Sequence, residues 1–290
     1  MANNPRILVT GASGQLGRLV IASLLKKVPA AQISGLVRKS EAAAELGALG
    51  IQTPMGDYLD TAALDAAMAG IDHVLLISGS EVGKRIPQHT NVIEAAKRAG
   101  VKRIAYTSIL HCDTSPLGLA EEHKGTEATL KASGLPYVLL RNSWYTENYF
   151  GNLAGDIERG VIIGCSGNGR ISAATRADYA EAGAVVMTTE EDIGGRTYEL
   201  GGDEAFTMAQ FAEELSRQAG KQVVYQDMSE KDYAAALASV GLPDFVAALL
   251  ANSSAGAAKD GLFDDGKQLS KLIGRPTTPL SQALATALKK

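Results

Sequence analysis

Residues 6–17 read Arg-Ile-Leu-Val-Thr-Gly-Ala-Ser-Gly-Gln-Leu-Gly, a short apolar run that leads through three glycines into an amphipathic stretch. Gly11 allows a tight turn off a strand, Gly14 lets a pyrophosphate approach the backbone, and Gly17 lets the following helix pack close to the sheet. The anion would meet free N–H groups at the positive end of the helix dipole. In this strand–loop–helix context the spacing G-x-x-G-x-x-G predicts a dinucleotide site rather than an ordinary glycine turn. We expect cofactor contacts from the whole loop: Gly11, Ala12, Ser13, Gly14, Gln15, Leu16 and Gly17.

Outward from this loop, apolar runs alternate with Ala- and Leu-rich helical stretches through the first 140 residues. The runs are short, rich in Val, Ile and Leu, and not strictly alternating, as is typical of strands covered on both faces. The predicted strands are Arg6–Thr10, Ile33–Val37, a weaker one at Ile51–Met55, Val74–Ile77, Arg103–Thr107 and Tyr137–Leu140. The predicted helices span 15–34, 40–49, 60–69, 87–99 and 120–133, and glycines suited to helix C-termini stand at Gly50, Gly70, Gly100 and Gly134. This order predicts an α/β fold, a Rossmann-type doubly wound parallel sheet.

The second half has a different rhythm and predicts a smaller C-terminal α/β lobe. Its predicted strands are Ile171–Ala174, Thr197–Leu200 and Val223–Gln226, and its predicted helices are Asp178–Thr188, Met208–Ala219, Glu230–Val240 and Pro279–Leu288. Thr207 and Gln210 fit a capping box, and Thr278 fits a cap that precedes Pro279 at the first helical position. No flexible linker separates the halves. We expect a dinucleotide-binding domain over residues 1–145, to whose sheet later strands can return, and a substrate lobe over residues 146–290.

The composition excludes several classes of protein. The 28 Lys and Arg residues are scattered and outnumbered by 32 Asp and Glu residues, so neither nucleic acid nor an anionic membrane is an expected partner. Cys112 and Cys165 are too few for a disulfide framework, and reduced thiols are favoured over a single bridge. No apolar stretch approaches the roughly 18 residues of a membrane span, and no secretory signal is visible. We therefore expect a cytoplasmic protein, and no Cys/His spacing indicates a metal site.

The residues after the second strand indicate which dinucleotide is bound. NAD sites usually place an acidic residue there for the ribose hydroxyls, but this chain has Arg38 and Lys39. A guanidinium suits a 2′-phosphate, so we expect NADPH; the alternative is a solvated basic turn. Further contacts are expected where the next strands end: Asp57 and Tyr58 near the adenine, and Ser78 and Gly79 near the ribose and nicotinamide.

The usual acid/base pair of this architecture, Tyr-x-x-x-Lys, occurs nowhere in the chain. Ser108 ends the fifth predicted strand where the partner serine of that pair would stand, but His123 and Glu127 occupy the positions of the Tyr and Lys. Chemistry that depends on that proton relay is therefore disfavoured. We expect His123 and Glu127 to form an exposed i, i+4 pair on a helix, worth about 0.2–0.5 kcal/mol.

Several motifs together resemble the NmrA-like group of atypical short-chain dehydrogenases. They are the glycine loop, Arg38, residues 80–83 and 87–89, residues 105–108, the segment Arg-Asn-Ser-Trp-Tyr-Thr-Glu-Asn at 141–148, and residues 261–265 with 271–274. Within that group the chain is most similar to bacterial type-2 NAD(P)H:quinone oxidoreductases, with triphenylmethane reductase as a near relative. The resemblance implies NADPH bound without a flavin and a small second lobe that closes over the nicotinamide. It also implies that one segment lines the nicotinamide and ribose: Asn142, Ser143, Trp144, Tyr145, Thr146 and Glu147.

The function expected from these observations is NADPH-dependent reduction of quinones by direct hydride transfer. Quinones accept hydride readily and solvent can supply the proton, so positioning would provide most of the catalysis. Asn142, Tyr145 and Ser108 are the candidate groups that hold the quinone oxygen. Trp144 and Tyr145 could wall a flat substrate slot, or could be core aromatic residues at a domain junction. Two alternatives stay open: an NADP(H)-sensing regulatory protein without turnover, and a reductase of another flat acceptor such as a triarylmethane dye. The oligomeric state is not predicted.

Overall fold

The computed structural model describes residues 4–289, which divide into two compact units. The first unit comprises the chain up to Ile109, Glu121–Asn142 and Arg176–Tyr198; the second comprises Leu110–Ala120, Ser143–Thr175 and the chain from Glu199 onward. The segment Arg176–Tyr198, which lies beyond residue 145, therefore belongs to the unit that contains the glycine loop.

The first unit is built on a six-stranded sheet with the order β2-β1-β3-β4-β5-β7. The strands are β1 (Ile7–Val9), β2 (Ile33–Gly35), β3 (His73–Leu76), β4 (Arg103–Ile109), β5 (Tyr137–Asn142) and β7 (Thr197–Leu200). The pairings from β2 through β5 are parallel, for example Ile7 with Ile33 and Leu75 with Ala105. The predicted α/β class with a doubly wound parallel sheet is confirmed. Because parallel strands end at one edge, the loops after β1, β3, β4 and β5 share that edge.

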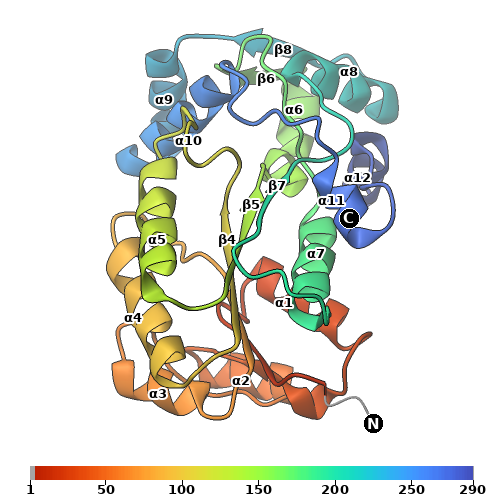
Figure 1. The fold of residues 1–290 in the computed structure, drawn as a ribbon. Helices are drawn as coiled ribbons and strands as arrows, with labels where there is room; N and C mark the ends of the chain where they lie inside the picture. Colours follow the sequence, from red (N-terminus) through yellow and green to blue (C-terminus); the bar gives the residue numbers. More distant parts are fainter. Residues whose placement is uncertain (1–3, 290) are drawn as a thin grey trace. The chain divides into compact units, whose positions relative to one another are not determined.

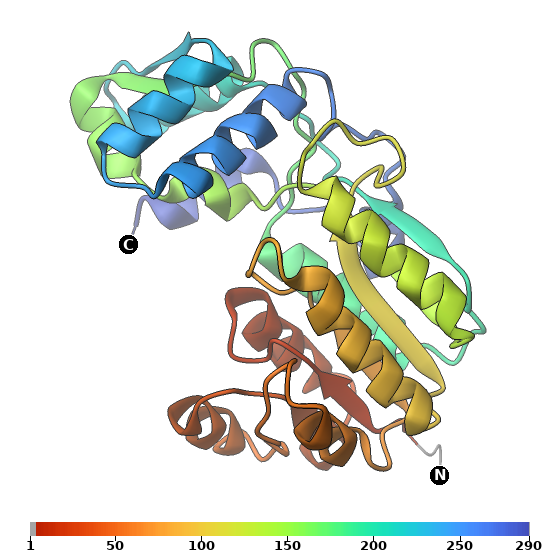
Figure 2. The same cartoon turned by 90° about the vertical axis from the view of Figure 1, so that its left-hand side faces the viewer.

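Helices cover both faces of this sheet (Figure 1). They are α1 (Gln15–Leu24), η1 (Ala30–Gln32), α2 (Ser40–Gly47), α3 (Thr61–Met68), α4 (Arg85–Arg98), α5 (Ala120–Ser133) and α7 (Arg176–Thr188). Side chains of α3, α4 and α5 form the core with Leu8, Val74 and Tyr106 of the strands, on the face seen in Figure 2. On the opposite face α1 packs against α7, where a Cβ added to Gly183 would lie 3.3 Å from Leu75 Cδ2. The small residue therefore sets the close approach of α7 to the sheet.

The second unit contains a two-stranded parallel sheet and a helical layer. Its elements are η2 (Thr146–Phe150), α6 (Leu153–Arg159), β6 (Val161–Gly164), α8 (Met208–Ala219), β8 (Val224–Asp227), α9 (Glu230–Ser239), α10 (Asp244–Ala257), α11 (Gln268–Ile273) and α12 (Leu280–Ala287). Rings of Tyr149, Phe150, Phe206 and Phe211 pack together with centroid separations of 5.7–6.4 Å. The capping box of Thr207 and Gln210 is confirmed. Cys112 and Cys165 are buried free thiols.

Some predicted elements differ in the structure for local reasons. The first helix ends at Leu24 and not at residue 34, because Pro29 cannot continue a helix. Residues 51–55 form two isolated bridges and not a strand, one from Gln52 to Ser34 of β2 and one from Met55 to Val37 after β2, since Pro54 has no N–H for the ladder. Residues 171–174 also form isolated bridges, to three different segments. The last helix begins at Leu280, so Pro279 is its N-cap rather than its first residue. The sequence did not predict α6, β6, α10 or α11.

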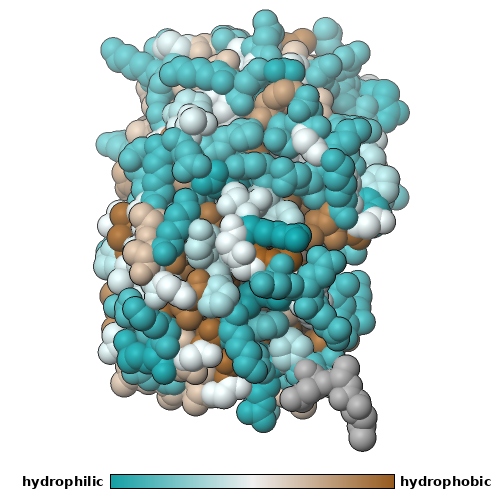
Figure 3. Space-filling model, viewed as in Figure 1, coloured by the Kyte–Doolittle hydropathy of each residue, from teal (hydrophilic) through white to brown (hydrophobic). Residues whose placement is uncertain are grey.

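The surface drawn in Figure 3 is mainly hydrophilic, with hydrophobic residues in small separate areas. Among residues 4–289, no helix combines the length and the apolar character that crossing a bilayer requires.

Candidate functional site

The glycine loop has the geometry that anion binding requires. Gly14 is the N-cap of α1 and makes no side-chain cap, so the first N–H groups of the helix stay free for a ligand. Gly11 has a φ of +59°, which disfavours other residues. A Cβ at Gly17 would lie 2.3 Å from the carbonyl oxygen of Gly11, so only glycine fits there. The loop is therefore a cradle that side chains would fill, and it suits a pyrophosphate.

Hydrogen bonds of Thr10 and Tyr58 stabilise the start of this loop. The Tyr58 hydroxyl donates to Thr10 Oγ1 at 2.6 Å and lies 3.1 Å from the carbonyl oxygen of Ile77. The N–H of Ile77 also donates to Thr10 Oγ1, at 3.1 Å. Burial raises the pKa of Tyr58 to about 12, although the hydrogen bond to Thr10 opposes this shift. Tyr58 therefore stays a donor, and it links the end of β1 to the end of β3.

Arg38 lies at the carboxyl side of β2, as predicted, and is mostly exposed. Its Nη1 atom is 3.3 Å from Glu81 Oε1 and 3.5 Å from Asp57 Oδ2. The structure thus brings the predicted residues Arg38 and Asp57 together. It also shows that Glu81, which the sequence did not single out as a site residue, shares the guanidinium.

Ser78 and Gly79 follow β3 at the same edge and are fixed by side chains. The N–H of Ser78 donates to Thr107 Oγ1 at 2.8 Å, and the N–H of Gly79 donates to His89 Nε2 at 3.0 Å. The carbonyl oxygen of Gly79 accepts from Arg85 Nε at 2.6 Å.

Ser108 is buried in a charged network that the sequence did not predict. Its hydroxyl donates to Glu127 Oε1 at 2.6 Å, and Arg141 donates to both carboxylate oxygens of Glu127, at 2.9 and 2.7 Å. Burial opposes the ionisation of Glu127, but these hydrogen bonds outweigh it and lower its pKa. The Ser108 proton is therefore committed to Glu127, and Ser108 offers a ligand lone pairs only.

The expectation of an exposed His123–Glu127 pair is wrong. Glu127 is 1% exposed and His123 is 6% exposed. Nδ1 of His123 lies 2.7 Å from the hydroxyl of Tyr106, so the two residues serve different buried partners. The helix face that carries them packs onto β4, which the spacing of four residues could not reveal.

Asn142 ends β5, and its side chain has a buried polar atom that a ligand could satisfy. It is buried, and its Oδ1 atom has no hydrogen-bond partner among the described residues. A buried unpaired amide oxygen is unfavourable by about 1–3 kcal/mol unless a donor arrives. Asn142 therefore fits a position that faces a bound molecule.

The remaining predicted residues belong to the second unit. They are Ser143, Trp144, Tyr145, Thr146 and Glu147. Ser143 Oγ donates to the carbonyl oxygen of Leu262 at 3.0 Å, and Ala174 exchanges backbone hydrogen bonds with Trp144 and Thr146, at 3.1 and 3.0 Å. The segment is thus held in a defined extended shape.

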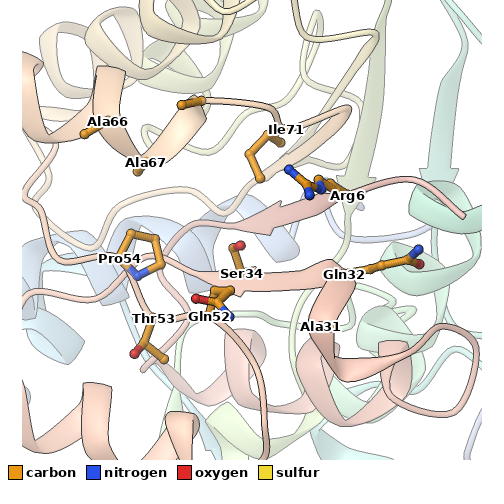
Figure 4. Close-up of a pocket in the computed structure, with 11 residues that line it drawn as sticks. Arg6, Ala31, Gln32, Ser34, Gln52, Thr53, Pro54, Ala66, Ala67 and Ile71 are labelled. Carbon is orange, nitrogen blue, oxygen red and sulfur yellow. The ribbon is translucent and has the colours of Figure 1, made fainter.

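A cavity of about 600 Å³ lies at the opposite edge of the first unit's sheet (Figure 4). It is lined by Arg6, which precedes β1, by Ser34 in β2 and by Ile71, which precedes β3, and none of the predicted site residues lines it. The dinucleotide site predicted from the glycine loop is therefore not this cavity.

Comparison with known proteins identifies the family. Residues 11–187 match the model of a family described as NAD(P)H-binding. The chain belongs to this NAD(P)H-binding family. The match begins at Gly11, the first glycine of the cradle, and extends to α7.

Proteins with known structures or activities match nearly the whole chain. Quinone oxidoreductase 2 of Escherichia coli is 58% identical over 279 residues, which cover 96% of this chain and 97% of that protein. The crystal structure of an E. coli NADPH-dependent quinone oxidoreductase complexed with NADPH is 57% identical, with a TM-score of 0.95 over 97% of this chain and 99% of that chain. Triphenylmethane reductase of Citrobacter sp., complexed with NADP(H), is 38% identical, with a TM-score of 0.93 over the same shares. The resemblance predicted from the motifs is confirmed.

Proposed function

We propose that this protein catalyses the NADPH-dependent reduction of quinones by direct hydride transfer, without a flavin. The observation that carries the proposal is the 58% identity to quinone oxidoreductase 2 over nearly the full length of both chains. The cradle at Gly11–Gly17 supports it independently, because its shape and its free N–H groups suit a dinucleotide. The expected cytoplasmic location belongs to the same proposal.

Each part of the cofactor has a proposed contact. The glycine loop holds the pyrophosphate, Arg38 the 2′-phosphate, and Asp57 with Tyr58 the adenosine end. Ser78, Gly79 and the segment Asn142–Glu147 hold the nicotinamide end.

Bound NADPH supplies a hydride, and solvent supplies a proton, which together convert a quinone into its hydroquinone. The protein's part is to orient the quinone and to stabilise the negative charge that develops on its oxygen. Asn142 is the leading candidate for this role, because its side chain is buried at the end of β5 and its amide NH2 group can donate to the quinone oxygen. Its Oδ1 atom, which has no partner among the described residues, can accept from a donor of the bound molecule. Ser108 can accept a hydrogen bond from a ligand, but it cannot donate its proton to the quinone because it donates that proton to Glu127. Tyr145 stays a predicted contact.

The test is consumption of NADPH by the purified protein on addition of small benzoquinones and naphthoquinones. We expect a colourless protein that oxidises NADPH only when quinone is present. A bound yellow cofactor, or no turnover with any quinone, would contradict the proposal. A triarylmethane dye belongs in the same assay, because the match to triphenylmethane reductase favours it as a second flat acceptor.

Asn142→Ala should lower kcat for quinone reduction by about 10²-fold, the usual effect of losing one oriented donor. Asn148→Ala, at the exposed position that follows the segment Asn142–Glu147, is the matched control and should retain wild-type kcat. Equal kcat values for the two variants would remove Asn142 from the mechanism.

A further inference from the structure

The loop after β3 takes its shape from the side chains of α4. Gly79 uses both of its backbone polar groups: its N–H donates to His89 Nε2 at 3.0 Å, and its carbonyl oxygen accepts from Arg85 Nε at 2.6 Å. Neither bond belongs to a strand ladder or to a turn. The position of Gly79 is therefore coupled to two side chains that lie 6 and 10 residues further along the chain.

The proton on His89 is placed by its two partners. Because Nε2 accepts the N–H of Gly79, the ring is neutral and Nδ1 carries the proton, which it donates to Thr126 Oγ1 at 2.9 Å. Thr126 in turn donates to the carbonyl oxygen of Glu122 at 3.0 Å. The ring is fully buried and packs edge-on against Tyr106, with centroids 5.4 Å apart. The hydrogen-bond chain thus runs in one direction, from Gly79 to α5.

Arg85 is held in place by the same neighbouring helix. Glu122 Oε1 accepts from the N–H groups of Gly83 and Arg85, at 2.8 and 3.2 Å, and so fixes the start of α4. The Arg85 side chain is buried, and its Nη1 lies 3.8 Å from Glu122 Oε2. A buried guanidinium whose Nε is aimed at one carbonyl oxygen is a fixed donor rather than a mobile surface charge.

We propose that His89 and Arg85 are positioning residues that hold the Ser78–Gly79 backbone in the shape that receives the bound dinucleotide. The inference rests on the proposed function, because it takes this loop as a cofactor contact. The placement of the loop supports it. Ile77 Cβ would lie 3.5 Å from a Cβ on Gly11, so the residue before Ser78 abuts the glycine cradle. A shift of Gly79 would therefore change the backbone geometry next to the glycine loop, where the cofactor is proposed to bind.

Two amide variants of His89 distinguish a role in positioning Gly79 from a role in core packing. A glutamine side chain places its oxygen near the position of Nε2 and can still accept from Gly79. An asparagine side chain reaches only the position of Nδ1, so it keeps the contact with Thr126 and leaves the Gly79 N–H without an acceptor. An unpaired buried N–H is costly, so His89→Asn should weaken NADPH binding by about 5- to 30-fold, whereas His89→Gln should stay within about threefold.

The dissociation constant of NADPH, measured by fluorescence titration without quinone, is the primary readout. We also expect KM for NADPH to rise in His89→Asn while KM for the quinone stays unchanged. Arg85→Met provides a second test if His89→Asn does not fold, with Lys84→Met as its exposed neighbour and control. Arg85→Met should weaken NADPH binding in the same range, and Lys84→Met should leave it within about threefold.

The outcomes distinguish this inference from the proposed function. If the wild-type protein binds NADPH but reduces no quinone, the enzyme proposal fails, while a selective loss in His89→Asn still supports the positioning role. If quinone is reduced and both His89 variants bind NADPH like the wild type, the positioning role is overturned alone. Equal losses in both variants would show that His89 serves packing only, and would also overturn it.

Discussion

At the scale of single residues, Arg38 is the predicted determinant of cofactor choice. Its side chain is 62% exposed and lies between the carboxylates of Asp57 and Glu81. In this position a 2′-phosphate would compete with Glu81 for the guanidinium. NADH carries a neutral ribose hydroxyl at that position, so the Arg38 guanidinium should contribute little to its binding.

Replacing Arg38 with Ala should therefore weaken NADPH binding by about 10- to 150-fold and leave NADH within about threefold. The lost charge-assisted hydrogen bonds are worth about 1.5–3 kcal/mol, at about 1.4 kcal/mol per decade. High salt should reduce the preference of the wild-type protein for NADPH over NADH, because the contact of Arg38 with the 2′-phosphate is exposed. The measurement is a pair of dissociation constants for each protein, and Arg98→Ala, which removes an exposed arginine paired with Asp65, is the control. Equal losses for both dinucleotides would show that Arg38 maintains the loop and does not bind the phosphate.

At the scale of elements, the junction between β1 and α1 depends on Gly17. A Cβ at Gly17 would meet backbone atoms of Gly11 and Ala12 at 2.3–2.9 Å, and backbone cannot yield as a flexible side chain can. The strand, the loop and the helix therefore keep their mutual geometry only with glycine at this position.

Gly17→Ala should displace the cradle and weaken NADPH and NADH binding by the same factor, more than about tenfold. It should also lower the free energy of unfolding by about 1–3 kcal/mol, as overpacking commonly does. This pattern is the opposite of that expected for Arg38→Ala, which discriminates between the dinucleotides. Gly151→Ala is the control, since no atom lies within 4 Å of a Cβ there. Unchanged binding in Gly17→Ala would mean that the loop relaxes without moving its N–H groups.

At the scale of the whole molecule, buried neutral histidines make stability depend on pH. Burial lowers the pKa of His89 to about 4 and that of His123 to about 3. An unfolded histidine has a pKa of about 6.5. Between these pH values the unfolded chain binds protons that the folded chain does not bind. The free energy of unfolding therefore falls as the pH decreases below about 6.5. Carboxylates of the unfolded chain titrate mainly below about 4.5, so they contribute little at the upper end of this range.

From pH 7 to pH 5 we expect a loss of about 2 kcal/mol for each of these two histidines. Urea denaturation at the two pH values measures it. His89→Gln should reduce the pH-dependent loss by about half, because glutamine does not titrate. The same free energy of unfolding at both pH values would contradict the burial of neutral rings.

The sequence alone determined the features that depend on neighbours along the chain. The glycine spacing after an apolar strand predicted the cradle, because φ preference and the free N–H groups of a helix start are local properties. The periodicity of apolar residues predicted the alternation of strands and helices, and Thr207 with Gln210 predicted a cap that the structure contains. Proline explains one misplaced helix end, before Pro29, and one predicted strand that does not form, at Pro54, and both prolines were visible in the sequence.

Only the tertiary structure decided which distant side chains meet. Glu127 joins Ser108 and Arg141 because β4 and β5 are adjacent in parallel register and α5 packs over them. His89 reaches Gly79 because α4 folds back along the strand that precedes it. Spacing along the chain could not reveal these contacts, since His123 and Glu127 read equally well as an exposed helical pair. Burial turned polar residues of ordinary surface type into a fixed network, because an unpaired polar group is costly away from water.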